Sequence, residues 1–211
     1  MSKDLLNQKR ALIFRIVHLD NLPRVLDRGC HCRRTTQGQA YVGIGNPELI
    51  EKRESRPVPC GPGGTLSDYV PFYFTPCTPM LYNIKTGYNG IIKRPMEEIA
   101  ILVSSIHFIG ERNIRFVFSD RHAYLKTAQF STDVVDLNWI IWDSLQERNF
   151  RKDDLERFEK YQAEALIYRH MPLDGLLGVA CFNAQRRDAV RAQIDARNLT
   201  LKVATRPAWY L

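Results

Sequence analysis

Short apolar runs alternate with polar segments that contain glycine or proline, and this pattern predicts a mixture of strands and helices. Runs rich in β-branched and aromatic residues predict strands, which lie at 11–18, 69–74, 99–104, 114–119, 164–170, 178–182 and 199–205. Helix-forming stretches lie at 20–29, 46–53, 122–130, 134–145, 152–160 and 184–197. Since the two kinds do not alternate regularly, we predict an α+β fold in a single domain, residues 1–211.

Local sequence refines several of these predictions. Asn46 and Pro47 form a helix start, with an N-cap followed by proline in the first turn, which places Arg53 near the helix end. Pro71 interrupts the strand at 69–74 and predicts an edge position or a bulge, because proline cannot donate to a sheet ladder. The segments 30–32 and 33–45 are expected to be loops.

The composition is that of a compact globular protein. Of the 211 residues, 45% are hydrophobic and 25% are charged, which is enough apolar material for a sizeable core. There is no apolar run of the roughly 20 residues that cross a bilayer and no secretory signal, so we expect a cytoplasmic protein without membrane contact. The 5 cysteines include no C-x-x-C pair, so we expect reduced thiols and no metal site.

The charge of the chain favours polyanionic partners. A formal net charge of +7 suits binding to phosphates, although many basic proteins bind no nucleic acid. Arginine and lysine gather at 33–34, 53–56, 148–152 and 186–187, and a solvated surface explains each cluster taken alone.

Motif searches exclude several kinds of chemistry. The chain lacks a phosphate-binding P-loop, a dinucleotide-binding G-x-G-x-x-G after a strand, H-E-x-x-H and G-x-S-x-G. What remains is a set of polar residues at the ends of apolar runs: His18, Arg53, Tyr73, His122 and Glu164. Judged singly, such histidines are usually structural and such glutamates are usually solvated.

Four segments, taken in order, resemble the motifs of the DarT family of bacterial DNA ADP-ribosyltransferase toxins. They are V-H-L-D-N-L-P-R-V-L from Val17, D-Y-V-P-F-Y-F-T-P-C-T-P-M-L from Asp68, F-S-D-R-H-A from Phe118 and Q-A-E-A-L-I from Gln162. The second and fourth segments are specific, and the resemblance spans nearly the whole chain. Cys77 and Ala165 depart from the family pattern, in which an arginine and an aromatic residue are common at these positions.

The resemblance implies an ADP-ribosyltransferase-like fold, in which helices surround a central split β-sheet or β-sandwich. It also implies a toxin that transfers ADP-ribose from NAD to a base in single-stranded DNA, thymine rather than guanine, without a metal. Glu164 would be the catalytic carboxylate and Arg53 would bind the pyrophosphate, with Arg56 as its neighbouring alternative. His122 would act on the acceptor base. His18, Asn21 and Tyr73 would contact NAD.

The segment before Glu164 is expected to select the acceptor. Expected DNA contacts are Met80, Phe150, Arg151, Arg157 and Tyr161, with aromatic rings stacking on an unpaired base and arginines meeting phosphates. The resemblance further implies a monomer with a macrodomain-type antitoxin as its partner. Two alternatives stay open: the same fold acting on RNA or protein, and a non-catalytic nucleic-acid-binding module.

Overall fold

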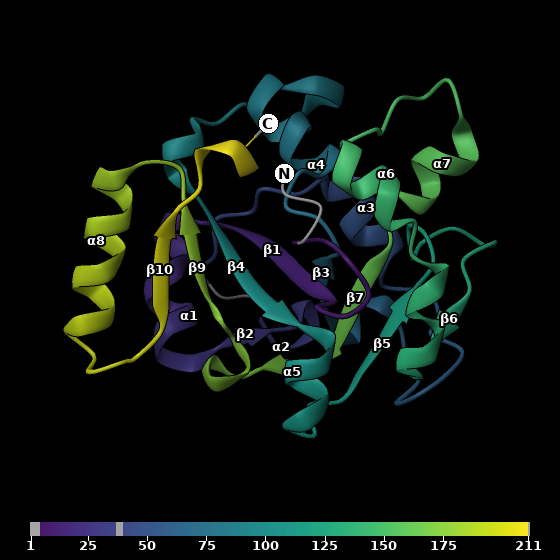
Figure 1. Cartoon of the computed structure of the whole chain (residues 1–211), viewed down its shortest axis with the longest axis horizontal. Coiled ribbons are helices and arrows are strands. Elements are labelled where there is room, and N and C mark those ends of the chain that lie inside the picture. The colour runs from purple at the N-terminus through teal and green to yellow at the C-terminus, as the bar shows by residue number, and fades with distance from the viewer. Residues whose placement is uncertain (1–4, 37–39, 211) are drawn as a thin grey trace.

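The computed structural model describes residues 5–36 and 40–210, which build a large mixed sheet with helices around it (Figure 1). Eight strands follow the order β10-β9-β4-β1-β3-β7-β5-β6, and a separate two-stranded sheet joins β2 to β8. Within the large sheet only β9 and β10 run parallel. The strands are β1 (Leu12–His18), β2 (Cys30–His31), β3 (Tyr69–Tyr73), β4 (Ile99–Ser105), β5 (Phe116–Ser119), β6 (Phe130–Ser131), β7 (Glu164–Tyr168), β8 (His170–Met171), β9 (Gly178–Cys181) and β10 (Lys202–Thr205).

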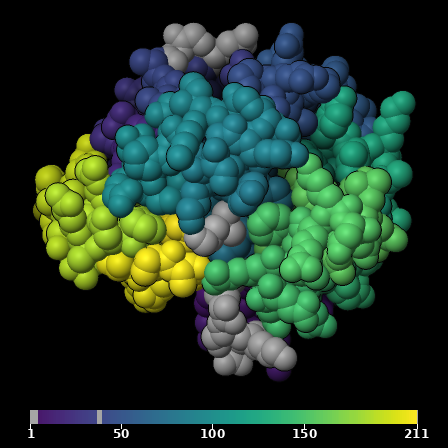
Figure 2. Space-filling model, turned by 90° about the horizontal axis from the view of Figure 1, so that it is seen from above, coloured from purple at the N-terminus to yellow at the C-terminus, as the bar shows by residue number. Residues whose placement is uncertain are grey.

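The helices lie around the sheet, with α8 beside the β9–β10 end and α4, α6 and α7 together at another side (Figure 1). Viewed from above, the α4 region and the region of residues 142–160 are neighbours on one face (Figure 2). The α-helices are α1 (Leu22–Arg28), α2 (Arg33–Thr36), α3 (Pro47–Lys52), α4 (Pro79–Thr86), α5 (Ile106–Glu111), α6 (Trp142–Glu147), α7 (Leu155–Lys160) and α8 (Ala184–Asp195). Short 3₁₀ turns lie at Leu19–Asn21, Leu66–Asp68, Tyr88–Gly90, Met96–Glu98, Val134–Trp139, Leu173–Gly175 and Pro207–Trp209.

The sheet is split between β1 and β3. These strands share one residue pair, Phe14 with Tyr73, whereas β1 pairs with β4 from Leu12 to His18. An arginine bridges the gap, because Arg15 NH1 donates a hydrogen bond of 2.8 Å to the carbonyl of Pro71. The predicted α+β class with a split central sheet is therefore confirmed.

Pro71 lies inside the sheet order, so the predicted edge position is wrong. It pairs with Leu166 of β7, and its carbonyl points into the split toward Arg15. The N and the C=O of one residue in an antiparallel strand face the same neighbour. The missing N–H of Pro71 therefore faces the gap, where no ladder bond is lost.

The helix expected at 122–130 does not form. Gln129 N, which a helix would pair with the Leu125 carbonyl, donates instead to Asp120. Leu125 N and Ala128 N donate to carbonyls three residues back, at His122 and Leu125, as in turns. These local bonds compete with helical ones and hold the segment in turns.

The loop expected at 30–45 is also partly wrong. Its first residues form β2, and α2 follows at Arg33–Thr36. Residues 37–39 lie outside the described residues. The helices expected at 46–53 and 184–197 are confirmed, with Asn46 and Asn183 as their N-caps.

Candidate active site

Glu164 is the first residue of β7, and its side chain is completely buried. Its Oε1 accepts hydrogen bonds from Arg53 NH1 and from Ala123 N, both at 3.1 Å. His122 Nδ1 lies 3.0 Å from the same oxygen, and Arg53 NH1 lies 2.9 Å from Oε2. A buried carboxylate thus meets two basic side chains and a backbone donor.

These neighbours keep Glu164 ionised. Burial alone raises the pKa of a carboxyl group, but the positive charge of Arg53, the contact with His122 and the Ala123 N–H outweigh it. The pKa of Glu164 falls from 4.5 to about 2. At neutral pH the group is a carboxylate and a weak base.

The lowered pKa predicts an acid-sensitive contribution to stability. The folded pKa lies below the unfolded one, so the stabilisation is present above about pH 4.5 and is lost as the pH falls toward 2. We expect urea midpoints to fall more steeply between about pH 4.5 and about pH 2 for the wild type than for Glu164→Gln. Parallel curves for the two proteins would show that Glu164 is not a buried carboxylate of depressed pKa.

Local sequence brings Arg53 and His122 to Glu164. Asn46 caps α3 through a 3.2 Å bond from Leu49 N, and the six-residue helix then carries Arg53 to its C-cap. His122 follows β5, and its backbone N donates to the carbonyl of Glu159 just ahead of β7. The Glu164 backbone N donates to Ser119 Oγ at 3.3 Å, which ties β7 to the same turn.

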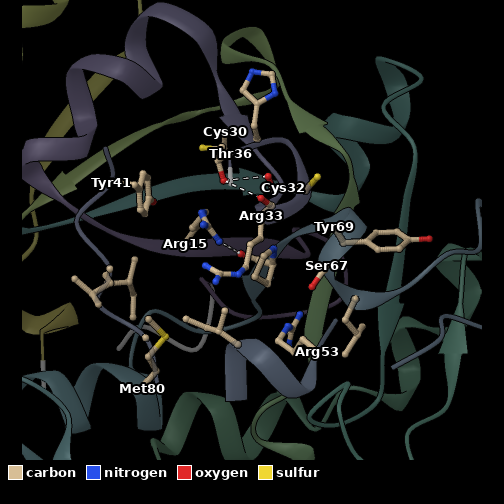
Figure 3. A pocket seen from close by; sticks show the side chains of 18 of the residues that line it. Arg15, Cys30, Cys32, Arg33, Thr36, Tyr41, Arg53, Ser67, Tyr69 and Met80 are labelled. Atoms are coloured by element: carbon tan, nitrogen blue, oxygen red, sulfur yellow. Dashed lines mark hydrogen bonds between the residues drawn. The ribbon is translucent and has the colours of Figure 1, made fainter. Parts of the chain in front are cut away.

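A pocket extends from Glu164 through the split between β1 and β3. Met80 and Arg53 lie on one side of it, Cys30 and Thr36 lie on the other, and Arg15 lies between (Figure 3). Glu164 is the only carboxylate among the lining residues, whereas the lining arginines are Arg15, Arg24, Arg33 and Arg53. The pocket therefore suits an anionic ligand with one electron-poor end.

Tyr73 and Met80 form the wall next to Glu164. Register places Tyr73 directly opposite Glu164 on β3, and both Tyr73 and Met80 line the pocket. The Tyr73 hydroxyl lies 3.9 Å from Met80 Sδ. Burial and then the charge of Glu164 raise the pKa of Tyr73, so its hydroxyl keeps its proton.

His18 and Asn21, the other expected NAD contacts, are not among the pocket-lining residues. His18 is buried, and its Nδ1 accepts from Asp20 N at 3.2 Å while Nε2 faces Glu98 at 3.3 Å. Asn21 exchanges two 2.9 Å bonds with the backbone of Val42. Both side chains are bonded within the protein, and their expected contacts with NAD stay a prediction.

Of the residues expected to contact the acceptor DNA, some are engaged within the protein and others are accessible. Tyr161 is 1% exposed and donates to the Cys77 carbonyl, so its ring is not free to stack on a base. Arg157 pairs with Asp153 at 2.9 Å. Arg151 is exposed, and Phe150 is half-buried against Tyr161. Only Met80 of this set lines the pocket.

Sequence reasoning missed Arg15 and Ser67. Both line the pocket, and Arg15 Nε and Ser67 Oγ are buried without a hydrogen-bond partner. Buried polar atoms are normally paired, so these two are free to meet a ligand. Arg15 could have been found from the sequence, because it is a charged residue inside the apolar run 11–18. Ser67 carried none.

Residues 5–36 and 40–210, which the structure describes, contain no cluster suited to a metal ion and no helix suited to span a bilayer. No group of three or more histidine, cysteine, aspartate or glutamate side chains there is arranged to hold a metal ion. None of the helices in that part of the chain has the length and apolar character needed to span a bilayer.

Comparison with known proteins identifies the family. Residues 14–211 match the family model described as "ssDNA thymidine ADP-ribosyltransferase, DarT". The chain belongs to the DarT family. Its DarT relatives include a DNA ADP-ribosyl transferase of Escherichia coli O127:H6, 50% identical over 208 residues that cover 97% of this chain and 95% of the relative.

Solved DarT structures have the same fold. Thermus sp. 2.9 DarT in complex with ADP-ribosylated ssDNA superposes with a TM-score of 0.89 at 30% identity, over 96% of this chain and 97% of that one. The same protein in complex with NAD+ gives a TM-score of 0.85 at 29% identity, over 96% and 98% of the two chains. The ADP-ribosyltransferase-like fold implied by the motifs is therefore confirmed.

Proposed function

We propose that this chain is a mono-ADP-ribosyltransferase that transfers ADP-ribose from NAD+ to the thymine base of single-stranded DNA. The observation that carries the proposal is the buried, ionised Glu164, held by Arg53 and His122 at the end of an arginine-lined pocket. Membership of the DarT family and the likeness to NAD+ and ADP-ribosylated ssDNA complexes of Thermus DarT support it.

On the donor side, Glu164 stabilises positive charge. Breaking the bond between the ribose C1′ and the nicotinamide nitrogen leaves both electrons on nicotinamide, which departs neutral, and leaves positive charge on the ribose. A carboxylate fixed in a buried site stabilises such charge without having to reorganise. Tyr73, opposite Glu164, provides an aromatic wall for the nicotinamide ring.

On the acceptor side, His122 is placed to move a proton. The thymine ring carries one N–H, whose proton must leave when that nitrogen bonds to C1′. A carboxylate with a pKa of about 2 is a poor base. We therefore propose that His122 Nε2 accepts the proton that leaves the thymine nitrogen, while Nδ1–H is directed at Glu164 Oε1. Glu164 then orients the imidazole and stabilises its charged form.

The pyrophosphate role expected of Arg53 passes mainly to other arginines. Arg53 directs NH1 to Glu164, and its buried NH2 has no hydrogen-bond partner. Arg56 donates to the Leu125 carbonyl and is not a pocket residue. Arg15, Arg24 and Arg33 line the pocket beyond Glu164 and supply the permanent charge that a diphosphate needs.

The biological role follows from the family. Modification of DNA bases in its own cell makes the protein a toxin. We propose a macrodomain-type antitoxin as its partner, a monomeric active form, and one ADP-ribosyltransferase domain over residues 1–211. The family match over residues 14–211 supports the single domain, whereas the antitoxin and the monomeric form rest on the resemblance of the motifs.

Labelled NAD+ tests the activity. We expect label from the adenylate portion to appear on single-stranded oligonucleotides that contain thymidine, and not on matched ones without it. RNA, duplex DNA and protein acceptors serve as controls in the same assay. A folded protein that labels no DNA, or that labels RNA or protein instead, would overturn the proposal.

A further inference from the structure

The α4 region and residues 142–160 are neighbours on one face (Figure 2), and aromatic rings from the two regions are in contact. We call Tyr82, Tyr88, Phe150 and Lys152 the outer aromatic surface. Tyr82 and Tyr88 are 43% and 47% exposed, which is unusual for such large rings. The ring of Tyr82 lies 6.4 Å from that of Tyr88 and 6.2 Å from that of Phe150.

The fold does not need these two rings for its core. Helix α4 buries Leu81 and Ile84 completely, and its N-cap bond from Leu81 N to Thr78 fixes its start. Tyr82 points away from this buried face. Tyr88 lies in the 3₁₀ turn after α4, where none of the three residues is buried.

The outer aromatic surface is connected to the active site through a buried aromatic contact and through α4. Phe150 contacts Tyr161 with ring centroids 5.2 Å apart, and Tyr161 lies three residues before Glu164. Met80, which lines the pocket, is on the same helix as Tyr82. Tyr82 lies two residues after Met80, on a different side of the same short helix, so a DNA strand whose base enters the pocket beside Met80 reaches Tyr82 by passing over α4.

The charge around the rings suits a nucleic acid. Lys152 lies 5.1 Å above the ring of Tyr88 and 5.6 Å from that of Phe158. Arg151 beside it is exposed, while Asp153 and Asp154 are both paired with Arg157. Exposed rings next to a cation are what single-strand binders use, because every base has a stacking face and every nucleotide a phosphate.

We propose that nucleotides flanking the modified thymidine stack on Tyr82 and Tyr88 while Lys152 contacts their phosphate backbone. The proposal rests on the proposed function and adds to it a second binding region outside the pocket. It makes activity dependent on oligonucleotide length, since a short substrate fills the pocket without reaching the rings.

Length-dependent kinetics test the proposal. Degenerate oligonucleotides of about 5 and about 21 nucleotides, each with one fixed central thymidine, are compared by kcat/KM. We expect the ratio of kcat/KM for the long oligonucleotide to kcat/KM for the short one to fall at least about fivefold in Tyr82→Ala/Tyr88→Ala. Stacking of a base on one aromatic ring strengthens binding by about this factor or more. Tyr82→Phe/Tyr88→Phe keeps the rings and should keep the ratio. Val135→Ala, also at an exposed apolar residue, serves as the control.

The phosphate contact has its own readout. Lys152→Gln should reduce the salt dependence of long-oligonucleotide binding by about 0.7 in log–log slope, the value for one contact to a single strand. Lys202→Gln removes an exposed lysine on β10 and should leave the slope unchanged.

The outcomes separate this inference from the proposed function. Wild-type protein that labels no DNA of either length would overturn the proposed function. Wild-type protein that labels DNA, with tyrosine variants of unchanged thermal stability that keep the wild-type length ratio, would overturn the outer aromatic surface alone. If Tyr82→Phe/Tyr88→Phe loses as much of the length ratio as the alanine variant, the tyrosine hydroxyls and not the rings contact the DNA. This result would also overturn the stacking proposal.

Discussion

Glu164→Gln is expected to lower kcat/KM for DNA labelling by about a thousandfold or more. The substitution keeps the shape of the side chain and an oxygen that can accept from Arg53 and Ala123 N, but it removes the negative charge. Losing even one preorganised electrostatic donor typically costs about 10² to 10³ in rate, and here a full charge next to the ribose is lost. The glutamine also fails to stabilise protonated His122.

NAD+ binding should survive this change, because the arginines of the pocket remain. We expect the Kd for NAD+, measured by calorimetry, to stay within a few fold while transfer is lost. Glu111→Gln makes the same chemical change at an exposed position on α5 and should retain wild-type rates. Near-normal transfer by folded Glu164→Gln would remove Glu164 from its catalytic role.

Periodicity and capping patterns predicted most of the elements that position this residue. The strand beginning at Glu164 and the helix between Asn46 and Arg53 both have local signals, apolar β-branched residues in one case and an Asn-Pro start in the other. The sequence alone could not show that they meet. Arg53 and Glu164 are 111 positions apart in the sequence. The register of β3 with β7 and the course of α3 bring them together.

The parts that could not be predicted depend on tertiary contacts. His122 was expected in a helix, yet Asp120 accepts the backbone N–H of Gln129, which a helix would pair with Leu125. Tyr161 was expected to stack on a DNA base, but its hydroxyl donates a hydrogen bond to the Cys77 carbonyl inside the core. Arg15 was passed over because a strand of buried neighbours gives no hint that the sheet splits beside it.

The expected pyrophosphate contact of Arg53 stays a prediction, to which the structure adds a partner within the protein. The family resemblance implied that Arg53 binds the pyrophosphate of NAD, a role that requires only a cation close to the diphosphate. Geometry shows a guanidinium 12% exposed and 2.9 Å from a carboxylate that is fully buried. Removing one member of such a buried pair leaves an uncompensated charge and is strongly destabilising.

Arg53→Met is expected to destabilise the fold by about 3 to 5 kcal/mol, because it leaves the Glu164 carboxylate buried without its main cation. Burial then raises the pKa of Glu164 against the weaker support of His122 and the Ala123 N–H. Transfer should fall by at least about a hundredfold at neutral pH. Because activity requires the ionised carboxylate, the residual rate should increase with pH through this raised pKa.

The double variant Arg53→Met/Glu164→Gln separates the causes. Removing the buried charge together with its partner should restore much of the lost stability in urea unfolding, since a buried pair often costs about as much to desolvate as it gains. It should restore no activity, because the ribose charge still lacks its carboxylate. Arg187→Met breaks the exposed pair with Asp188 and should leave the free energy of unfolding nearly unchanged. If Arg53→Met is as stable as the wild type and Glu164→Gln changes nothing in its background, the two side chains do not act as a buried pair, and the donor-side mechanism loses its basis.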